Sequence, residues 1–278
     1  MNKYNSSMFD SIKDALTKQQ KQGNGSRDIL ALEKGNTYVV RLVPNIKDPE
    51  KSWFKYQTFS WNSVITGAYT QSLSPLSWGE RDPIAEERIK FYKQGSDEVK
   101  KKMETLNLRR SEKWLMRAYV VSDPVNPENN GKVKLLRFGK QLFNIINNAI
   151  IGEDSDEFGY RVFDFSSSGV NLKIKVTIQG EFANYTESRF TSPVDLKLNE
   201  GQIEEIYAAG GGLETIYSCR GYDDIKKLFD EHYHGAIDGP AVATNNARTE
   251  SVVREQVSQV SAPDEDEDEK IRNLLSGL

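Results

Sequence analysis

RRSEKWLMRAYVVSDP at residues 109–124 and KVKLLRFGK at residues 132–140 form the stretch that decides the fold. Two runs within it, Trp114 to Val121 and Lys132 to Phe138, are rich in β-branched, aromatic and long apolar side chains and predict strands. The connection VNPENNG at residues 125–131 is rich in turn-forming residues. We therefore predict a strand pair with an ordered connecting loop.

The same stretch is strongly basic. Residues 100–140 hold eleven lysines and arginines and four acids, an excess of seven positive charges, and Trp114, Tyr119 and Phe138 lie among them. Cations displace phosphate counterions and ring faces stack on bases of any identity, so this composition on strands suits single-stranded nucleic acid. The alternative is a half-buried strand pair whose cations face solvent and whose aromatics are core, because alternation along a strand gives the same pattern.

Composition favours one large folded domain with polar tails. The 278 residues are 37% hydrophobic and 28% charged, with a mean hydropathy of -0.63 and a net charge of -4. The negative balance comes from residues 241–278, where eight acids outnumber four bases. Cys219 is the only cysteine, which suits a reducing compartment, and no secretory signal or membrane-spanning apolar run is recognisable.

The order of predicted elements divides the chain into three parts. Residues 1–25 indicate an arm with a short amphipathic helix that docks on its own domain or on a neighbouring copy, residues 26–234 a folded core, and residues 235–278 a linker with an acidic tail. Residues 58–107 are predicted to form a subdomain inserted in the core. The remaining predicted elements are strands at 37–43, 53–61 and 170–178 and helices within 82–106 and at 142–151, 200–209 and 222–233.

The acidic tail has the features of a partner peptide. Six consecutive acids, Asp264 to Glu269, precede apolar residues at helical spacing. A solubilising tail and a mimic of phosphate that occupies the protein's own cleft are the alternatives. The residues predicted to contact partner proteins are Asp264, Glu265, Asp266, Leu274, Leu275 and Leu278.

Motifs for catalysis or zinc binding are not recognisable. No glycine-rich phosphate loop follows a predicted strand, and no Ser/His/Asp set can be read. Cys219, His232 and His234 are the only soft metal ligands, whereas a structural zinc site needs four ligands and usually a close cysteine pair. We therefore expect neither an enzyme nor a cofactor or metal. Arg41 lies inside an apolar strand and must reach solvent or an anion, because a buried unpaired guanidinium is very costly.

Several motifs are similar to those of the single-stranded DNA-binding, helix-destabilising proteins of T-even-like bacteriophages. Besides Trp114, they are VVRLVP at 39–44, RRS at 109–111, DP at 123–124, PEN at 127–129, GKV at 131–133, RFGK at 137–140 and FANYTESRF at 182–190. The resemblance covers residues 30–190 in patches. It implies an α+β chain with an OB-fold-like β-barrel core, inserted and appended helices, a cleft for single-stranded DNA, an arm that makes binding cooperative and a tail that contacts replication, recombination and repair proteins.

The resemblance also implies roles for individual residues. Arg41, Arg109 and Arg110 would contact phosphates. The bases would stack on Trp114, Phe182 and Tyr185. Together with the cations of the basic stretch, the predicted DNA-binding residues are Arg41, Arg109, Arg110, Lys113, Trp114, Lys132, Lys134, Arg137, Phe182 and Tyr185.

The chain departs from the family pattern at three places. Well-known family members hold a zinc ion through one histidine and three cysteines, but the matching residues 58–93 contain neither residue type. We expect an apolar core there instead, filled by Trp61, Tyr69, Leu73, Leu76 and Trp78. Leu136 replaces a tyrosine, which removes one stacking ring, and the arm carries only Lys3 with Ser6 and Ser7 in place of a compact basic run.

These observations predict a non-enzymatic, sequence-tolerant and cooperative single-stranded DNA-binding protein of phage DNA replication, recombination and repair. It would act in the host bacterial cytoplasm, with neighbouring protomers and replication proteins as partners and without a membrane. An RNA-binding regulator that uses the same cleft is one alternative, because every base has a π-face. A replisome scaffold that acts through its tail is the other.

Overall fold

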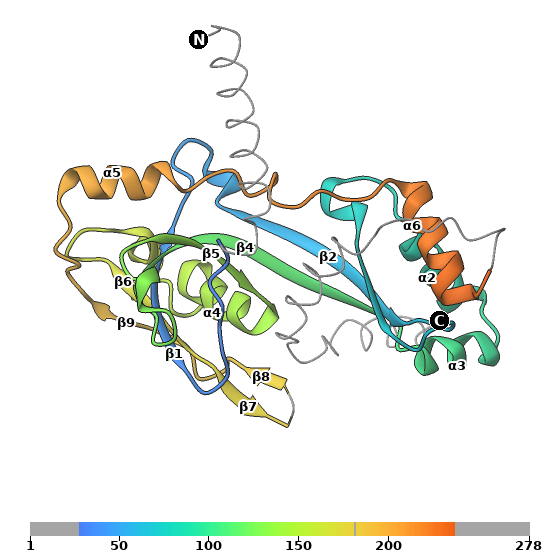
Figure 1. Ribbon diagram of the computed structural model, residues 1–278. Helices are drawn as coiled ribbons and strands as arrows, with labels where there is room; N and C mark the ends of the chain where they lie inside the picture. Colours follow the sequence, from blue (N-terminus) through green and yellow to red (C-terminus); the bar gives the residue numbers. More distant parts are fainter. Residues whose placement is uncertain (1–27, 181, 237–278) are drawn as a thin grey trace, which may run out of the picture.

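A computed structural model describes residues 28–180 and 182–236 (Figure 1). Seven strands form one antiparallel sheet in the order β3-β2-β4-β1-β6-β9, with β5 paired to β4. These strands are β1 (Thr37–Val43), β2 (Trp53–Asn62), β3 (Tyr69–Leu73), β4 (Arg109–Ser122), β5 (Val133–Phe138), β6 (Val170–Lys175) and β9 (Arg189–Pro193). The helices are α2 (Pro83–Gln94), α3 (Asp97–Thr105), α4 (Lys140–Ile151), α5 (Glu200–Ala208) and α6 (Tyr222–Phe229). The predicted α+β class and the predicted pairing of the two basic strands are confirmed.

The predicted barrel is not closed. Within the described residues, β3 and β9 end the strand order, so the sheet stays open. The physical reason is the length of β4, which pairs with β2 over Arg109–Met116 and with β1 over Arg117–Ser122. β1 and β2 therefore follow one another along β4, and the sheet borders several hydrophobic cores, of which the two largest are described next, instead of wrapping around one.

The first core belongs to the main lobe, which contains β1, β5, β6, β9, the C-terminal half of β4 and α4. Val40, Met116 and Leu172 are fully buried in it. α4 begins directly after β5 and ends at Gly152, as predicted, and it buries Leu142, Ile146 and Ala149 against the same core. Its apolar stripe therefore covers one face of the sheet.

The second core belongs to the helical lobe, which contains α2, α3, α6, β3 and the end of β2 (Figure 1). Trp61 is fully buried there, as predicted, but Tyr69 and Leu76 are 46% and 42% exposed and do not fill this core. The remaining volume is filled from a distant part of the chain. The buried residues of this core are Phe59, Trp61, Ile84, Met103, Leu108, Ile225, Phe229 and Tyr233.

The start of α2 follows the sequence signals closely. Pro83 occupies the first helical position, and the Asp82 carboxylate accepts hydrogen bonds from the backbone N–H groups of Ile84 and Ala85. A side-chain acceptor at this position satisfies donors that have no partner within the helix. Asp82 is buried and also accepts a hydrogen bond from Ser74 Oγ, so the cap anchors α2 to the segment after β3.

The predicted strand at residues 170–178 is interrupted. Its apolar positions are buried through Val176, although Asn171 of the predicted polar face is buried as well, and the chain then leaves the large sheet. β7 (Thr177–Gln179) pairs instead with β8 (Phe182–Asn184) in a two-stranded hairpin that extends away from the main lobe (Figure 1). Ile178 is consequently 62% exposed rather than part of the core.

The predicted arm, residues 1–25, and the tail residues Asp264, Glu265, Asp266, Leu274, Leu275 and Leu278 lie outside the described residues. Among the described helices, none combines the length and the apolar character that crossing a membrane requires.

Candidate nucleic-acid interface

Arg41 is a buried structural residue and not a surface cation. Its side chain is 0% exposed, and its Nε donates to Asn171 Oδ1 at 2.9 Å. The two terminal nitrogens donate to backbone carbonyls, among them those of Gly169 at 3.0 Å and Val194 at 2.7 Å. A Cβ atom at residue 169 would lie 2.6 Å from Arg41 Nη1, so only glycine allows this close approach.

This arrangement corrects the predicted phosphate contact of Arg41. Burial lowers the pKa of its guanidinium, and the nearby Asp164 opposes that shift. The sequence predicted that Arg41 reaches solvent or an anion, but the hydrogen bonds of the buried cation go to neutral carbonyl oxygens and one amide instead. With its donors directed at these groups inside the main lobe, Arg41 has no access to a bound strand.

Trp114 and Tyr185 are core residues too. Trp114 is 5% exposed and stacks on Phe143, with ring centroids 4.3 Å apart and planes inclined by 15°. Lys55 Nζ lies 5.5 Å from the centroid of the Trp114 ring. Tyr185 is 7% exposed, and burial raises the pKa of its hydroxyl. Both rings expose little surface to solvent, so their burial does not support the predicted stacking of bases, which stays a prediction.

The predicted cations of β4 and β5 do not form one surface. Side chains alternate across a strand, so Arg110 and Glu112 share one face of β4 while Arg109, Lys113 and Arg117 share the other. On this second face, Arg117 Nη1 is bound to Asp28 Oδ2 at 2.6 Å. Leu213 and the partly buried Tyr217, from the segment between α5 and α6, pack against the same face.

The remaining predicted residues differ in exposure and lie on different elements. Arg109 and Lys132 are exposed, at the start of β4 and just before β5 respectively. Lys134 and Arg137 are partly buried on β5. Phe182 is 37% exposed on the β7–β8 hairpin.

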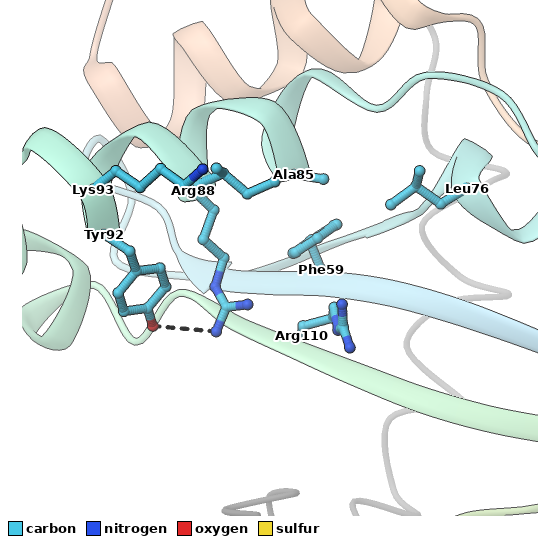
Figure 2. Close-up of a pocket in the computed structure, with 8 residues that line it drawn as sticks. Phe59, Leu76, Ala85, Arg88, Tyr92, Lys93 and Arg110 are labelled. Atoms are coloured by element: carbon cyan, nitrogen blue, oxygen red, sulfur yellow. Dashed lines mark hydrogen bonds between the residues drawn. The ribbon is translucent and has the colours of Figure 1, made fainter. Parts of the chain in front are cut away.

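A solvent-accessible pocket lies in the helical lobe, beside the start of β4. It encloses about 230 Å³ between α2 and the paired strands β2 and β4 (Figure 2). Phe59 and Arg110, which are opposite each other in the register of β2 and β4, form the strand side of the pocket. The other lining residues are Leu76 and five residues of α2, namely Ala85, Arg88, Ile89, Tyr92 and Lys93.

Cations and rings of this pocket are held in place by specific contacts. Arg88 extends from α2 toward the strands, and its Nη2 donates to the Tyr92 hydroxyl at 3.3 Å (Figure 2). The Arg88 guanidinium carbon also lies 5.1 Å from the centroid of the Tyr92 ring. Although Arg88 is only 5% exposed, it brings positive charge to the pocket wall. Such an anchored guanidinium loses little further freedom when it meets an anion.

The Glu112 carboxylate organises the cations next to the pocket. Its Oε1 lies 2.7 Å from Lys55 Nζ and 3.6 Å from Arg110 Nη2, and it accepts a hydrogen bond from Gln57 Nε2 at 3.2 Å. Glu112 itself is 8% exposed. The buried Glu112 therefore aligns Lys55 and Arg110 along the bridge formed by β2 and β4. With Arg88 and Lys93, the surface holds four cations and this single acid. We call this surface the bridge site. It consists of Lys55, Phe59, Arg88, Tyr92, Lys93, Arg110 and Glu112.

Most of the bridge site was not predicted from the sequence. Arg110 was, but Lys55, Phe59, Arg88, Tyr92 and Lys93 were not. The available signal was the spacing of Arg88 and Tyr92, which four residues apart share a helix face with the apolar residues Ala85 and Ile89. An arginine on the apolar side of an amphipathic helix indicates an anion or a buried partner, but it does not identify the opposing strand.

Comparison with known proteins identifies the family of the chain. Residues 33–229, which include both lobes, match the family described as gp32 DNA binding protein like. The chain is 30% identical over 152 residues to the "Single-stranded DNA-binding protein" of Enterobacteria phage T4, an alignment that covers 52% of this chain and 50% of that protein. The protein of the same name from Enterobacteria phage T2 gives the same identity and coverage. The chain thus spans about half the length of the curated relatives it matches, and it belongs to the gp32-like DNA-binding protein family.

Proposed function

We propose that this protein binds single-stranded DNA along the bridge site with little dependence on base sequence. The observation that carries the proposal is the pocket in which Arg88 and Arg110, from different elements, lie beside Phe59 and Tyr92. Guanidinium groups exchange with the counterions of phosphates, while rings accept any base. The names of the T4 and T2 relatives support single-stranded DNA as the ligand.

We assign separate roles to the residues of the site. Lys55, Lys93 and Arg110 contact the phosphate backbone, and the exposed Arg109 extends this track at the start of β4. The partly buried Tyr92 provides the ring surface for a base, while the buried Phe59 closes the apolar floor of the pocket behind it. Among the other predicted residues, Lys113, Lys132, Lys134, Arg137 and Phe182 are candidates for a longer strand that continues over the main lobe.

The wider role is proposed on the same basis. Binding to an exposed strand and not to duplex shifts melting toward open DNA by mass action, which needs no catalysis. We propose that the open sheet of the main lobe is a variant of the OB-fold, that residues 1–25 make binding cooperative between neighbouring protomers, and that residues 235–278 recruit proteins of phage replication, recombination and repair in the host bacterial cytoplasm.

A competition experiment tests the ligand. Fluorescence anisotropy with a labelled DNA oligomer is measured against unlabelled single-stranded DNA, duplex DNA and RNA of matched sequence, at several salt concentrations. We expect single-stranded DNA of any sequence to compete best and the affinity to fall steeply with salt. Stronger competition by RNA would identify an RNA-binding protein instead, and equal competition by duplex would contradict selective binding of the single strand.

A further inference from the structure

A cluster of metal-ligating side chains lies at the end of α6, in the helical lobe. Glu87 from α2 and Asp230 and His234 from the π-helical turn Asp230–His234 place one ligand atom each within 4.8 Å of one another. His234 Nε2 is 2.7 Å from Glu87 Oε1. The three side chains are about one third exposed, so an ion can reach them from solvent.

The contribution from two different elements distinguishes this cluster from an ordinary ion pair. Asp230 and His234 are four residues apart in one helical turn, and Glu87 approaches from the facing helix. Short π-helical turns are found frequently at functional sites. An ion held by all three groups would connect α2 to the last described turn of the chain, directly before Gly235.

The imidazole of His234 is oriented by its neighbours. Phe229 and Tyr233 meet it edge to face, with ring centroids 5.4 Å and 5.1 Å away and interplanar angles of 86°. Phe91 of α2 packs against it in the same manner at 6.4 Å. These contacts hold the imidazole with Nε2 directed at Glu87, so one of the three ligands is preorganised.

The donor set indicates the class of ion. One imidazole nitrogen and two carboxylate oxygens suit zinc(II) and similar transition metals better than magnesium or calcium, which prefer oxygen ligands alone. Bonds of about 2.0–2.2 Å in a tetrahedral site require ligand atoms roughly 3.3 Å apart. The separations in the cluster, 2.7 Å between His234 Nε2 and Glu87 Oε1 and at most 4.8 Å among the three ligand atoms, lie on both sides of this value.

We propose that Glu87, Asp230 and His234 bind one zinc(II) ion, with water completing its coordination. The ion replaces the Glu87–His234 contact and draws Asp230 Oδ2 from Lys226 Nζ, 2.5 Å away, whose side chain is 55% exposed and can turn into solvent. The site joins α2 to the C-terminal turn of the helical lobe. This inference does not depend on DNA binding.

Zinc titration of the full-length protein tests the proposal. After treatment with chelator and its removal, the protein is titrated with zinc chloride by isothermal calorimetry, and its thermal midpoint is followed at the same zinc concentrations. We expect one equivalent to bind and the midpoint to rise with zinc concentration. Magnesium at the same concentrations should produce neither effect.

Matched variants locate the site. His234→Ala and Glu87→Gln should weaken zinc binding by about tenfold or more, whereas His232→Ala should retain it. His232 is a suitable control because it is the only other histidine and its Nδ1 is engaged at 3.0 Å by Ser63 Oγ. Circular dichroism verifies that each variant is folded, and Glu87→Gln preserves side-chain size if His234→Ala unfolds.

Two results would overturn the proposal. The first is the lack of stoichiometric zinc binding by the folded wild-type protein. The second is binding that Glu87→Gln and His234→Ala leave unchanged, which would place the ion elsewhere, for example on the acids at 264–269 or on Cys219. A Cys219→Ser variant separates these last two sources.

Discussion

The two halves of β4 have similar side chains but different surroundings. In the half that pairs with β1, within the main lobe, Arg117 is bound to Asp28. In the half that pairs with β2, Arg110 lines a pocket that is open to solvent. The comparison teaches that a mixture of cations and aromatics on a strand does not by itself mark a binding surface. What decides is whether another layer of the protein covers that face.

Arg41 provides the most severe test, because all of its polar contacts lie inside the protein. Arg41→Ala should lower the free energy of unfolding by on the order of 5 kcal/mol, since it leaves several buried acceptors unpaired and each costs about 1–3 kcal/mol. Urea denaturation measures this loss. Arg41→Lys keeps the charge but not the planar fork of donors and should also destabilise. If the folded Arg41→Lys protein has normal stability and weakened DNA binding, Arg41 is a DNA contact and not a structural residue.

Trp114 tests the effect of coverage with an apolar residue, because it is buried although it lies in the half of β4 that pairs with β2. Trp114→Ala should lower the free energy of unfolding by about 3–5 kcal/mol, because it leaves a cavity beside Phe143. Chemical denaturation measures the loss, and binding per folded molecule should be nearly normal. Phe182→Ala, on the exposed hairpin, is the matched control and should cost little stability. A stable Trp114→Ala protein with poor DNA binding would restore this ring as a stacking platform.

Arg110 tests the open half. Arg110→Ala should weaken binding to single-stranded DNA by about 1.5–3 kcal/mol, the contribution of a hydrogen bond to a charged group, and should reduce the salt dependence by roughly one phosphate contact. Anisotropy titrations at several salt concentrations measure both. Glu112→Gln should act in the opposite direction, because it removes the acid that competes for Lys55 and Arg110. An unchanged affinity and salt slope in both variants would remove the bridge site from the DNA path.

Asp82 tests whether the helical lobe depends on its cap. Asp82→Ala should cost about 1–2 kcal/mol in unfolding free energy, because two backbone donors of α2 and Ser74 lose their acceptor. Asp82→Asn retains an acceptor and should cost less. Differential scanning calorimetry distinguishes them. Equal midpoints for wild type and Asp82→Ala would show that tertiary packing alone holds α2.

The smallest expected effect is a pH dependence from the same carboxyl. Burial raises the pKa of Asp82 above its ordinary value of 3.8. A folded-state pKa above the unfolded value means that the stabilising contribution is complete below pH 3.8 and is lost as pH rises through the folded-state pKa. The stability of the wild type relative to Asp82→Asn should therefore fall as pH rises from 3.8. If the stability of the wild type relative to Asp82→Asn rises with pH over this range, the pKa of Asp82 is lowered by folding and the prediction is wrong.

Most elements could be predicted from the sequence, because their signals are local. The strand at 37–43 has the observed bounds, and Asp82 followed by Pro83 begins a helix as predicted. These features depend on turn chemistry, capping and alternation within a few residues of the chain. The prediction for 170–178 was wrong at its end, because Val176 is the last buried position before the chain turns away to pair with β8.

The sequence by itself thus determined the class of the fold, the positions of its elements and its similarity to a DNA-binding family. Only the tertiary structure decided which side chains are available. It buried Arg41 among carbonyl groups, left the sheet open, brought α6 into the core of residues 59–108 and placed Arg88 beside Arg110. The proposed zinc site likewise unites Glu87 with Asp230 and His234 across a long separation in the chain. The physical reason is that local signals specify the alternation of side chains, whereas burial depends on which element packs over each face.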